Sequence, residues 1–217
     1  GKRVLAEGAQ GTLLDIDFGT YPFVTSSTTT AAGACTGLGV APTRIGEVIG
    51  IFKAYCTRVG SGPFPTELHG KTGEALRKAG HEFGATTGRP RRCGWLDLPA
   101  LKHACMLNGV TQLCMMKADV LDGFHEVEVC THYMVDGVRS DHLPYILEET
   151  LVTPVFEPRE GWPGAGQSGA GTELPASLTA YVKEIESLTK TRISIVSMGP
   201  DRDQTHAFES ATSTIYD

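Results

Sequence analysis

The segment Met116-Lys117-Ala118-Asp119 follows a short apolar run and carries the side chains best suited to reading a nucleobase. A carboxylate at Asp119 can accept both edge protons of guanine, N1–H and the 2-amino group, a donor pair that adenine lacks. The aliphatic stem of Lys117 can cover the base face while its ammonium group stays in water. The alternative is an ordinary surface Lys–Asp pair at a strand end, and so short a motif favours that alternative when taken alone. Met116 also stands where the N-K-x-D pattern of guanine readers has Asn.

A second segment, residues 84–92 (GATTGRPRR), places three arginines within four positions. Their charges repel one another, so in an acidic protein they need bound anions or nearby acids to offset them. Guanidinium groups match carboxylates and phosphates, and the threonines and glycines supply hydroxyls and approachable backbone N–H groups. A solvated basic loop is the alternative, but the accompanying glycine and threonine favour anion binding.

Two further segments carry polar groups that suit a purine nucleotide. Gln10 follows a short apolar stretch, and its amide can both donate to and accept from a purine edge. The hydroxyls of Thr25-Ser26-Ser27 suit a phosphate, although each of these residues alone is typical of an ordinary loop. Ser197-Met198-Gly199 comes after the last apolar run, where it forms either another nucleotide-contact loop or only a turn.

Residues 164–169 match the pattern G-x-G-x-x-G of dinucleotide-binding proteins. That interpretation requires a strand directly before the motif and a helix that begins at it. Here Trp162-Pro163 precedes the motif, and the next helix is expected only near Pro175. The segment is therefore interpreted as a flexible glycine-rich loop.

Hydrophobic spacing predicts the strands that position these segments. Four strands are expected, at residues 4–6, 112–116, 127–135 and 193–196. Asp136-Gly137 follows the third strand directly and indicates a hairpin. Residues 55–59 either continue a helix or form a strand, and the β-branched Thr57 and Val59 favour a strand.

The same spacing predicts helices between these strands. They are expected at residues 42–52, 73–79, 98–108 and 178–188, the third with Asp97 as N-cap and Asn108-Gly109 at its C-terminal end. Residues 15–40 are expected to form a long functional loop, and the tail 203–217 is expected to fray. Helices that alternate with short apolar strands predict an α/β fold with a mostly parallel sheet and one antiparallel hairpin.

Composition narrows the class of protein. The chain has 217 residues, 41% of them hydrophobic, which is enough for the core of one domain. Its net charge of −6 argues against nucleic-acid binding, so an anion site must be a local cluster of cations. Six cysteines without a C-x-x-C pair and seven histidines without ligand spacing predict reduced thiols, a cytoplasmic protein and no metal site. No apolar run approaches the ~20 residues of a membrane span.

In order, these segments resemble the adenylosuccinate synthetase family. The resemblance runs from residue 4 to about residue 202 and rests on residues 7–17 (EGAQGTLLDID), 19–27 (GTYPFVTSS), 58–67 (RVGSGPFPTE), 84–97 (GATTGRPRRCGWLD), 117–123 (KADVLDG) and 199–202 (GPDR). It implies the C-terminal part of a P-loop-type nucleotide-binding α/β fold. It also implies a homodimeric, Mg²⁺-dependent ligase that joins IMP and L-aspartate at the expense of GTP, in the biosynthesis of AMP.

The resemblance also implies a role for each matching position. Gln10, Thr25 and Arg89 would contact IMP, with Gln10 supporting catalysis. Aspartate would be held by Ala85, Thr86, Thr87, Gly88, Arg89 and Arg91. GTP would be contacted by Arg91, Lys117, Ala118, Asp119, Ser197, Met198 and Gly199.

The family's glycine-rich phosphate loop, its catalytic Asp and His and its Mg²⁺ contacts match nothing in this sequence. The chain begins Gly1-Lys2-Arg3, without Met, which is expected of a segment cut from a longer chain. We therefore expect residues 1–217 to be the C-terminal half of one domain, inactive alone. A free-standing half that only binds nucleotide or pairs with another chain is the alternative, and a dinucleotide-dependent dehydrogenase is a distant third.

Overall fold

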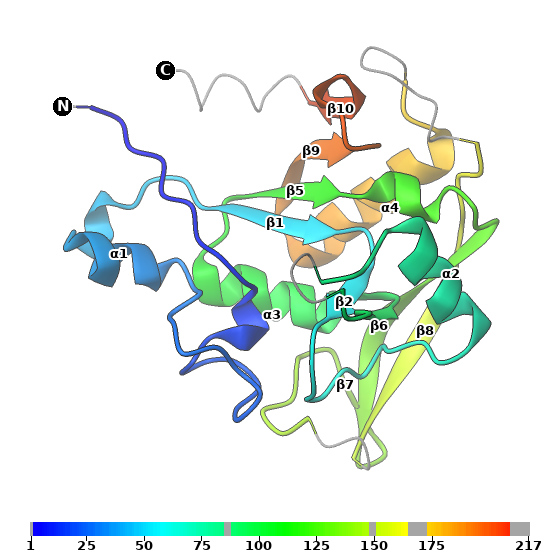
Figure 1. Ribbon diagram of the computed structural model, residues 1–217, viewed down its shortest axis with the longest axis horizontal. Coiled ribbons are helices and arrows are strands. Elements are labelled where there is room, and N and C mark those ends of the chain that lie inside the picture. The colour runs from blue at the N-terminus through cyan, green and yellow to red at the C-terminus, as the bar shows by residue number, and fades with distance from the viewer. Residues whose placement is uncertain (1, 85–87, 148–150, 165–172, 209–217) are drawn as a thin grey trace.

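The computed structural model describes residues 2–84, 88–147, 151–164 and 173–208 and has an α/β fold (Figure 1). The central sheet has the strand order β1-β5-β9-β10. Strands β1 (Ile49–Lys53), β5 (Gln112–Met116) and β9 (Arg192–Ser197) are parallel, and β10 (Thr205–Ala207) is antiparallel to β9. The predicted α/β class with a mostly parallel sheet is therefore confirmed.

A second sheet contains the predicted hairpin. Strand β4 (Leu96–Asp97) runs parallel to β6 (Glu126–Val135), and β6 pairs antiparallel with β7 (Val138–Ser140) and β8 (Val152–Glu160). The β6–β7 turn has positive φ at Asp136 and Gly137, 49° and 76°, as a tight hairpin turn requires. A separate antiparallel pair joins β2 (Cys56–Arg58) to β3 (Arg92–Gly94).

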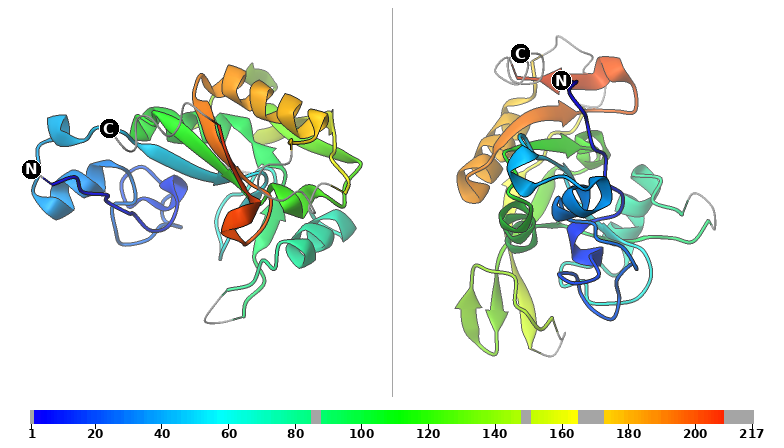
Figure 2. Two further views of the ribbon diagram at one scale, coloured as in Figure 1. Left: turned by 90° about the horizontal axis from the view of Figure 1, so that it is seen from above. Right: turned by 90° about the vertical axis from the view of Figure 1, so that its left-hand side faces the viewer.

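In the described part of the chain, four α-helices and several 3₁₀ turns connect these strands. The helices are α1 (Ala32–Leu38), α2 (Lys71–Ala79), α3 (Leu98–Asn108) and α4 (Ala176–Thr189). The 3₁₀ turns are η1 (Thr12–Leu14), η2 (Pro42–Arg44), η3 (Ala118–Leu121) and η5 (Arg202–Gln204). Helices α3 and α4 pack together on one face of the central sheet (Figure 2).

The main core lies between the central sheet and α4. Leu113, Met115 and Ile193 of the sheet and Leu178 and Ile185 of the helix are each at most 1% exposed. Burial of such aliphatic side chains is worth about 1.5–3 kcal/mol each, so this layer fixes the sheet on which the strand ends are arranged.

Helix α3 begins as the sequence predicts. The Asp97 carboxylate accepts from the Ala100 backbone N–H at 3.0 Å, and Gly109 closes the helix in the left-handed conformation, φ 60°. The Tyr133 hydroxyl of β6 also donates to Asp97, at 2.5 and 2.6 Å to its two oxygens. This capped helix start therefore ties β4, β6 and α3 together.

Several predicted elements are wrong. Residues 4–6 form no strand, and Val4 and Leu5 are 79% and 88% exposed. The helix expected over 42–52 is only the turn η2 followed by strand β1, and the expected loop 15–40 contains helix α1. Strand β8 was not expected, and the tail expected to fray from residue 203 forms β10. Residues 209–217 of that tail lie outside the described residues.

Candidate functional site

The candidate site lies where the parallel strands of the central sheet end. In register, Lys53 at the end of β1 pairs with Met116 at the end of β5, and Met115 pairs with Val196 near the end of β9. The arrowheads of β1 and β5 point to the same side of the molecule, toward α2 (Figure 1). Ligands of open α/β sheets bind at this carboxyl edge.

A buried glutamate gathers three cations at this edge. Glu82 is 0% exposed, and its Oε1 accepts from Lys53 Nζ at 2.8 Å, Tyr55 Oη at 2.5 Å and Lys117 Nζ at 3.0 Å. Its Oε2 accepts from Arg91 Nη1 at 2.7 Å. We call these five residues the Glu82 cluster. The cluster brings Lys117, which follows β5, and Arg91, which belongs to segment 84–92, to a single carboxylate.

The Glu82 cluster carries excess positive charge. Burial raises the pKa of Glu82, but hydrogen bonds from Lys53, Tyr55 and Lys117 outweigh burial and lower the pKa to about 2, so the group is ionised at neutral pH. Three cations against one carboxylate leave two positive charges in excess in a protein of net charge −6. The three cationic side chains remain 26–37% exposed, so an anion from solvent can reach them.

Asp119 lies two residues after Lys117. Lys117 has a left-handed backbone, φ 60°, which redirects the chain from β5 into η3, where Asp119 is half-buried. Burial raises the pKa of Asp119, while the neighbouring charge of Lys117 opposes the rise. Ala118 between them is fully buried, and its carbonyl accepts from Trp162 Nε1 at 2.8 Å. Only Lys117 and Asp119 therefore present side chains from this motif.

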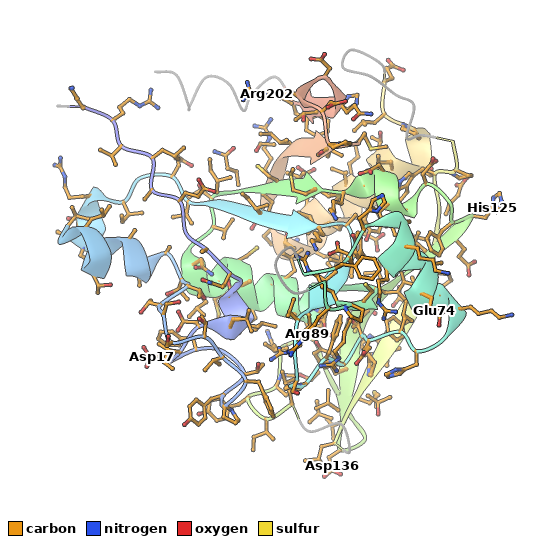
Figure 3. All side chains as sticks on the ribbon, viewed as in Figure 1. Asp17, Glu74, Arg89, His125, Asp136 and Arg202 are labelled. Atoms are coloured by element: carbon orange, nitrogen blue, oxygen red, sulfur yellow. The ribbon has the colours of Figure 1, made fainter. Side chains whose placement is uncertain are left out.

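The segment after Glu82 folds back on itself and returns to the cluster. The Gly84 N–H donates to the Arg89 carbonyl, and the Gly88 N–H, with φ 63°, donates to the Gly84 carbonyl, both at 2.8 Å. The Arg91 N–H then donates to the Glu82 carbonyl at 2.9 Å. The described residues of this segment project from the body of the molecule (Figure 2), and Arg89 is on its returning arm (Figure 3). Ala85, Thr86 and Thr87, predicted to bind aspartate, lie outside the described residues.

The arginines of this segment have different surroundings. Arg91 binds Glu82, and its Nε is buried with no hydrogen-bond partner among the described residues. Arg92 points to the other side of strand β3, where it pairs with Glu67 and donates to the Gly62 carbonyl at 2.7 Å. Arg91 thus belongs to the Glu82 cluster, while Arg92 stabilises the neighbouring loop.

The segment Ser197-Met198-Gly199 offers mainly its backbone to a ligand. The Ser197 hydroxyl donates to the Gly199 carbonyl at 2.9 Å, and the Met198 side chain is 0% exposed. A Cβ atom at Gly199 would lie 2.1 Å from Oε1 of Gln204, so only glycine fits there without displacing that side chain. The predicted contact with a nucleotide would therefore use main-chain groups.

Gln10 and Thr25 lie outside the Glu82 cluster. Gln10 is exposed, with φ 61°, and Thr25 is half-buried on residues 11–30, where its N–H donates to the Leu14 carbonyl at 2.8 Å. Asp15, 0% exposed, organises this loop. Its carboxylate accepts four backbone N–H groups, from Asp17, Phe18, Thr29 and Thr30, at 2.7–3.2 Å.

Two residues outside the loop hold it against the body of the molecule. Asn108, the last residue of α3, donates to Thr12 Oγ1 at 3.0 Å and accepts from the Ala31 N–H at 2.8 Å. Arg58 of β2 donates to Thr20 Oγ1 at 3.0 Å. Arg58 is paired in register with Arg92 of β3, so the loop is connected to the strand that follows Arg91.

Sequence reasoning missed Glu82, Lys53 and Asp15 as organising residues. One signal pointed to Glu82: three clustered arginines need nearby acids, and Glu82 lies two residues before their segment begins. The structure supplies two acids, Glu82 for Arg91 and Glu67 for Arg92. Asp15 carries no comparable signal, because the backbone groups it binds become neighbours only after the loop has folded.

The described residues do not provide a metal site. Across residues 2–84, 88–147, 151–164 and 173–208, no group of three His, Cys, Asp or Glu side chains could hold a metal ion. All six cysteines are free thiols. None of the helices in the described part of the chain is long and apolar enough to cross a bilayer.

The fold and this site define an α/β protein with a cluster of cations at the carboxyl edge of a parallel sheet, where ligands of open α/β sheets bind. The family model of adenylosuccinate synthetase matches residues 1–206, and the chain belongs to this family.

Individual relatives agree with this assignment. The chain is 61% identical over 207 residues to the adenylosuccinate synthetase of Cytophaga hutchinsonii, covering 94% of this chain and 48% of that protein. It is 59% identical to the enzyme of Wolinella succinogenes, with 94% and 49% covered. A structure of fully ligated adenylosuccinate synthetase from Plasmodium falciparum superposes with a TM-score of 0.88 at 41% identity, covering 93% of this chain and 49% of that one. The chain thus spans about half the length of the relatives it matches.

Proposed function

We propose that this chain is the C-terminal half of a GTP-dependent ligase that joins IMP and L-aspartate to form adenylosuccinate. The observation that carries the proposal is the Glu82 cluster, which holds Arg91 and Lys117 on one carboxylate in a chain of this family. One residue comes from the segment assigned to aspartate and the other from the segment assigned to guanine. Their meeting at one sheet edge supports a single site for both ligands.

In the proposed reaction, IMP loses its N1 proton to a base as its 6-oxygen attacks the γ-phosphorus of GTP, and the bond from that phosphorus to GDP breaks. The aspartate amine then attacks C6, the C6–O bond breaks, and phosphate leaves with the bonding electrons while the amine loses a proton. Adenylosuccinate, GDP and phosphate are the products. Charge develops on phosphoryl oxygens in both steps, and preorganised donors are suited to stabilising it.

The described residues would bind and orient the substrates. Asp119 would accept N1–H and the 2-amino group of guanine, and the Lys117 stem would cover the base. The guanidinium group of Arg91, whose side chain is 30% exposed, would bind the aspartate carboxylate or a GTP phosphate. Main-chain groups of residues 197–199 would also contact GTP. IMP would be contacted by Gln10, Thr25 and Arg89.

Mg²⁺ does not fit the residues described here, because they include no cluster of three potential ligands. We therefore assign no metal ligand and no reaction step through a metal to this chain. The proposal places the metal contacts, the phosphate loop and the catalytic Asp and His in a preceding half of the protein. A homodimeric, cytoplasmic enzyme is part of the same proposal.

The experiment that tests the function compares the full-length protein with residues 1–217 alone. Each is incubated with IMP, aspartate, GTP and Mg²⁺, and adenylosuccinate is measured by chromatography. We expect product from the full-length protein and none from residues 1–217. A full-length protein that binds GTP without turnover would overturn the proposal in favour of a nucleotide-binding subunit, and product from residues 1–217 would contradict the proposed division of the site.

A further inference from the structure

We propose that Glu82 is a positioning residue that sets both the guanine side and the aspartate side of the site at once. This inference rests on the proposed function. The two oxygens of the carboxylate serve different sides: Oε1 accepts from Lys117 at 3.0 Å, and Oε2 accepts from Arg91 at 2.7 Å. Neither ligand-binding cation is therefore oriented independently of the other.

The position of Glu82 is itself closely fixed. Tyr55, 1% exposed, donates to Oε1 at 2.5 Å, and the Glu82 N–H donates to the Arg77 carbonyl at 2.9 Å. A Cβ atom at Gly80 would lie 2.3 Å from the Tyr55 hydroxyl, so the turn that presents Glu82 is packed against that tyrosine. A carboxylate held from several sides offers its acceptors in one orientation, which is what preorganisation of a site requires.

The cations also depend on Glu82 for their direction. Lys117 Nζ has a second acceptor, the Gly80 carbonyl at 2.6 Å, and both acceptors turn its ammonium toward the cluster. Arg91 uses Nη1 for Glu82, which leaves Nε buried beside the carboxylate without a partner among the described residues. Without Glu82 the three cations repel one another, and Lys117 and Arg91 would turn apart toward solvent.

A purely structural role is the competing explanation, and steady-state kinetics separates the two. Loss of stability reduces the fraction of folded enzyme, which lowers the apparent kcat and the melting temperature but leaves each KM unchanged. Loss of positioning changes the KM values of the folded enzyme. Because Glu82 serves both sides, the positioning role requires the KM values for GTP and for aspartate to rise together.

The test uses Glu82→Gln in the full-length protein. The amide keeps the shape of the side chain but cannot balance three cations, and its NH₂ group cannot accept a hydrogen bond. Glu67→Gln is the matched control, because Glu67 also pairs with an arginine, Arg92, yet has no contact with Lys117 or Arg91. Glu82→Asp is the second variant: it keeps the charge but is one methylene too short to reach both sides.

We expect Glu82→Gln to raise the KM for GTP and for aspartate by about tenfold or more each. Glu82→Asp should raise both by a smaller factor, and Glu67→Gln should leave both within about twofold. If Glu82→Gln does not fold, the Glu82→Asp result decides. Unchanged KM values, or a rise in only one of them, would overturn the inference even where the melting temperature falls. A wild-type protein without ligase activity would overturn the proposed function and this inference with it.

Discussion

In the proposed function, Asp119 would select a base through the number of hydrogen bonds it accepts. It follows a left-handed Lys117 and is half-buried at the strand end, so its carboxylate is directed by the backbone more than by neighbouring side chains. A guanine bound there donates two hydrogen bonds, and a hydrogen bond to a charged group contributes about 1.5–3 kcal/mol.

In the full-length protein, Asp119→Asn should weaken GTP and favour XTP. An asparagine keeps one acceptor for N1–H and offers a donor to the 2-oxo group of xanthine, whereas it repels the 2-amino group of guanine. We expect the kcat/KM ratio of GTP to XTP to fall by about a hundredfold. Asp122→Asn, three positions further along the chain, is the control. An unaltered preference for GTP would contradict the assignment of Asp119.

In the proposed function, Asp15 would affect the binding of IMP through the loop that it folds. Burial raises the pKa of its carboxyl group, but hydrogen bonds from four backbone N–H groups outweigh burial and lower the pKa. Asp15→Asn should raise the KM for IMP by about tenfold, because the amide loses acceptors and the loop that carries Thr25 loosens. The KM for GTP should stay within about twofold. Asp17→Asn, on the same loop (Figure 3), should change neither value, and equal effects of the two substitutions would contradict the role of Asp15.

The residues of the site were predictable where the side chain itself is proposed to contact a ligand. Lys117, Asp119 and Arg91 stand in segments whose composition already indicates binding, and the structure brings Lys117 and Arg91 together. Glu82 and Asp15 bind other parts of the chain instead of a ligand. Their partners are distant in sequence or are backbone groups, so residue type and spacing carry little information about them.

At the scale of elements, the start of α3 carries an ionisable group in an apolar setting. Burial raises the pKa of Asp97 to about 6, although the hydrogen bonds from Tyr133 and Ala100 lower it in part. Since the ordinary value is 3.8, the folded state binds more protons than the unfolded state between these two pH values. Stability from this group is therefore fully present below pH 3.8 and is lost as pH rises through about 6.

Asp97→Asn should remove this dependence on pH. The amide keeps a good N-cap but does not ionise, so the stability of the variant relative to wild type should rise between pH 4 and pH 6.5 by about 3 kcal/mol. Urea denaturation of residues 1–217 across this range measures the difference. Asp141→Asn, an exposed aspartate, is the control. A constant difference between Asp97→Asn and wild type across the range would show that Asp97 has no such shift.

The errors in predicting elements have physical causes. Ile49 and Phe52 fit a helical spacing with Ile45 and Val48, but pairing of residues 49–53 with the buried strand β5 overrides that local pattern. Strand β8 contains Pro154 and Pro158, which conceal a strand in the sequence. Within the described ranges β8 pairs with β6 alone, and an edge strand tolerates proline. Capped helices and strands buried on both faces, such as α3 and β5, carry local signals and were predicted.

At the scale of the whole molecule, the central sheet has an apolar edge. Strand β1 is one of the two edge strands of this sheet among the described residues, and Ile51 and Ile49 on it are 75% and 37% exposed. An edge strand with exposed apolar side chains is a template for pairing with another chain. In the proposed full-length protein, the preceding half would cover this edge.

Residues 1–217 alone should therefore self-associate, and Ile51→Lys should reduce this. A charged side chain on the edge strand opposes pairing with a second sheet. In sedimentation experiments, we expect the variant to associate only at about tenfold higher protein concentration than wild type. Val138→Lys is the control, because Val138 is 69% exposed but lies on the β6–β7 hairpin. Equal effects of both substitutions would mean that the apolar surface as a whole, and not the β1 edge, drives association.

The two hydrogen bonds between Asn108 and the loop affect how the molecule would respond to cleavage. Its amide holds Thr12 and Ala31, on either side of the loop, while Phe23 between them is 45% exposed. A protease that cut the chain after Phe23 would leave both severed arms fastened to the same helix end. The nicked molecule would migrate as two pieces in detergent and as one in native buffer, since the side chains of Asn108 and Asp15 join what the broken backbone no longer connects.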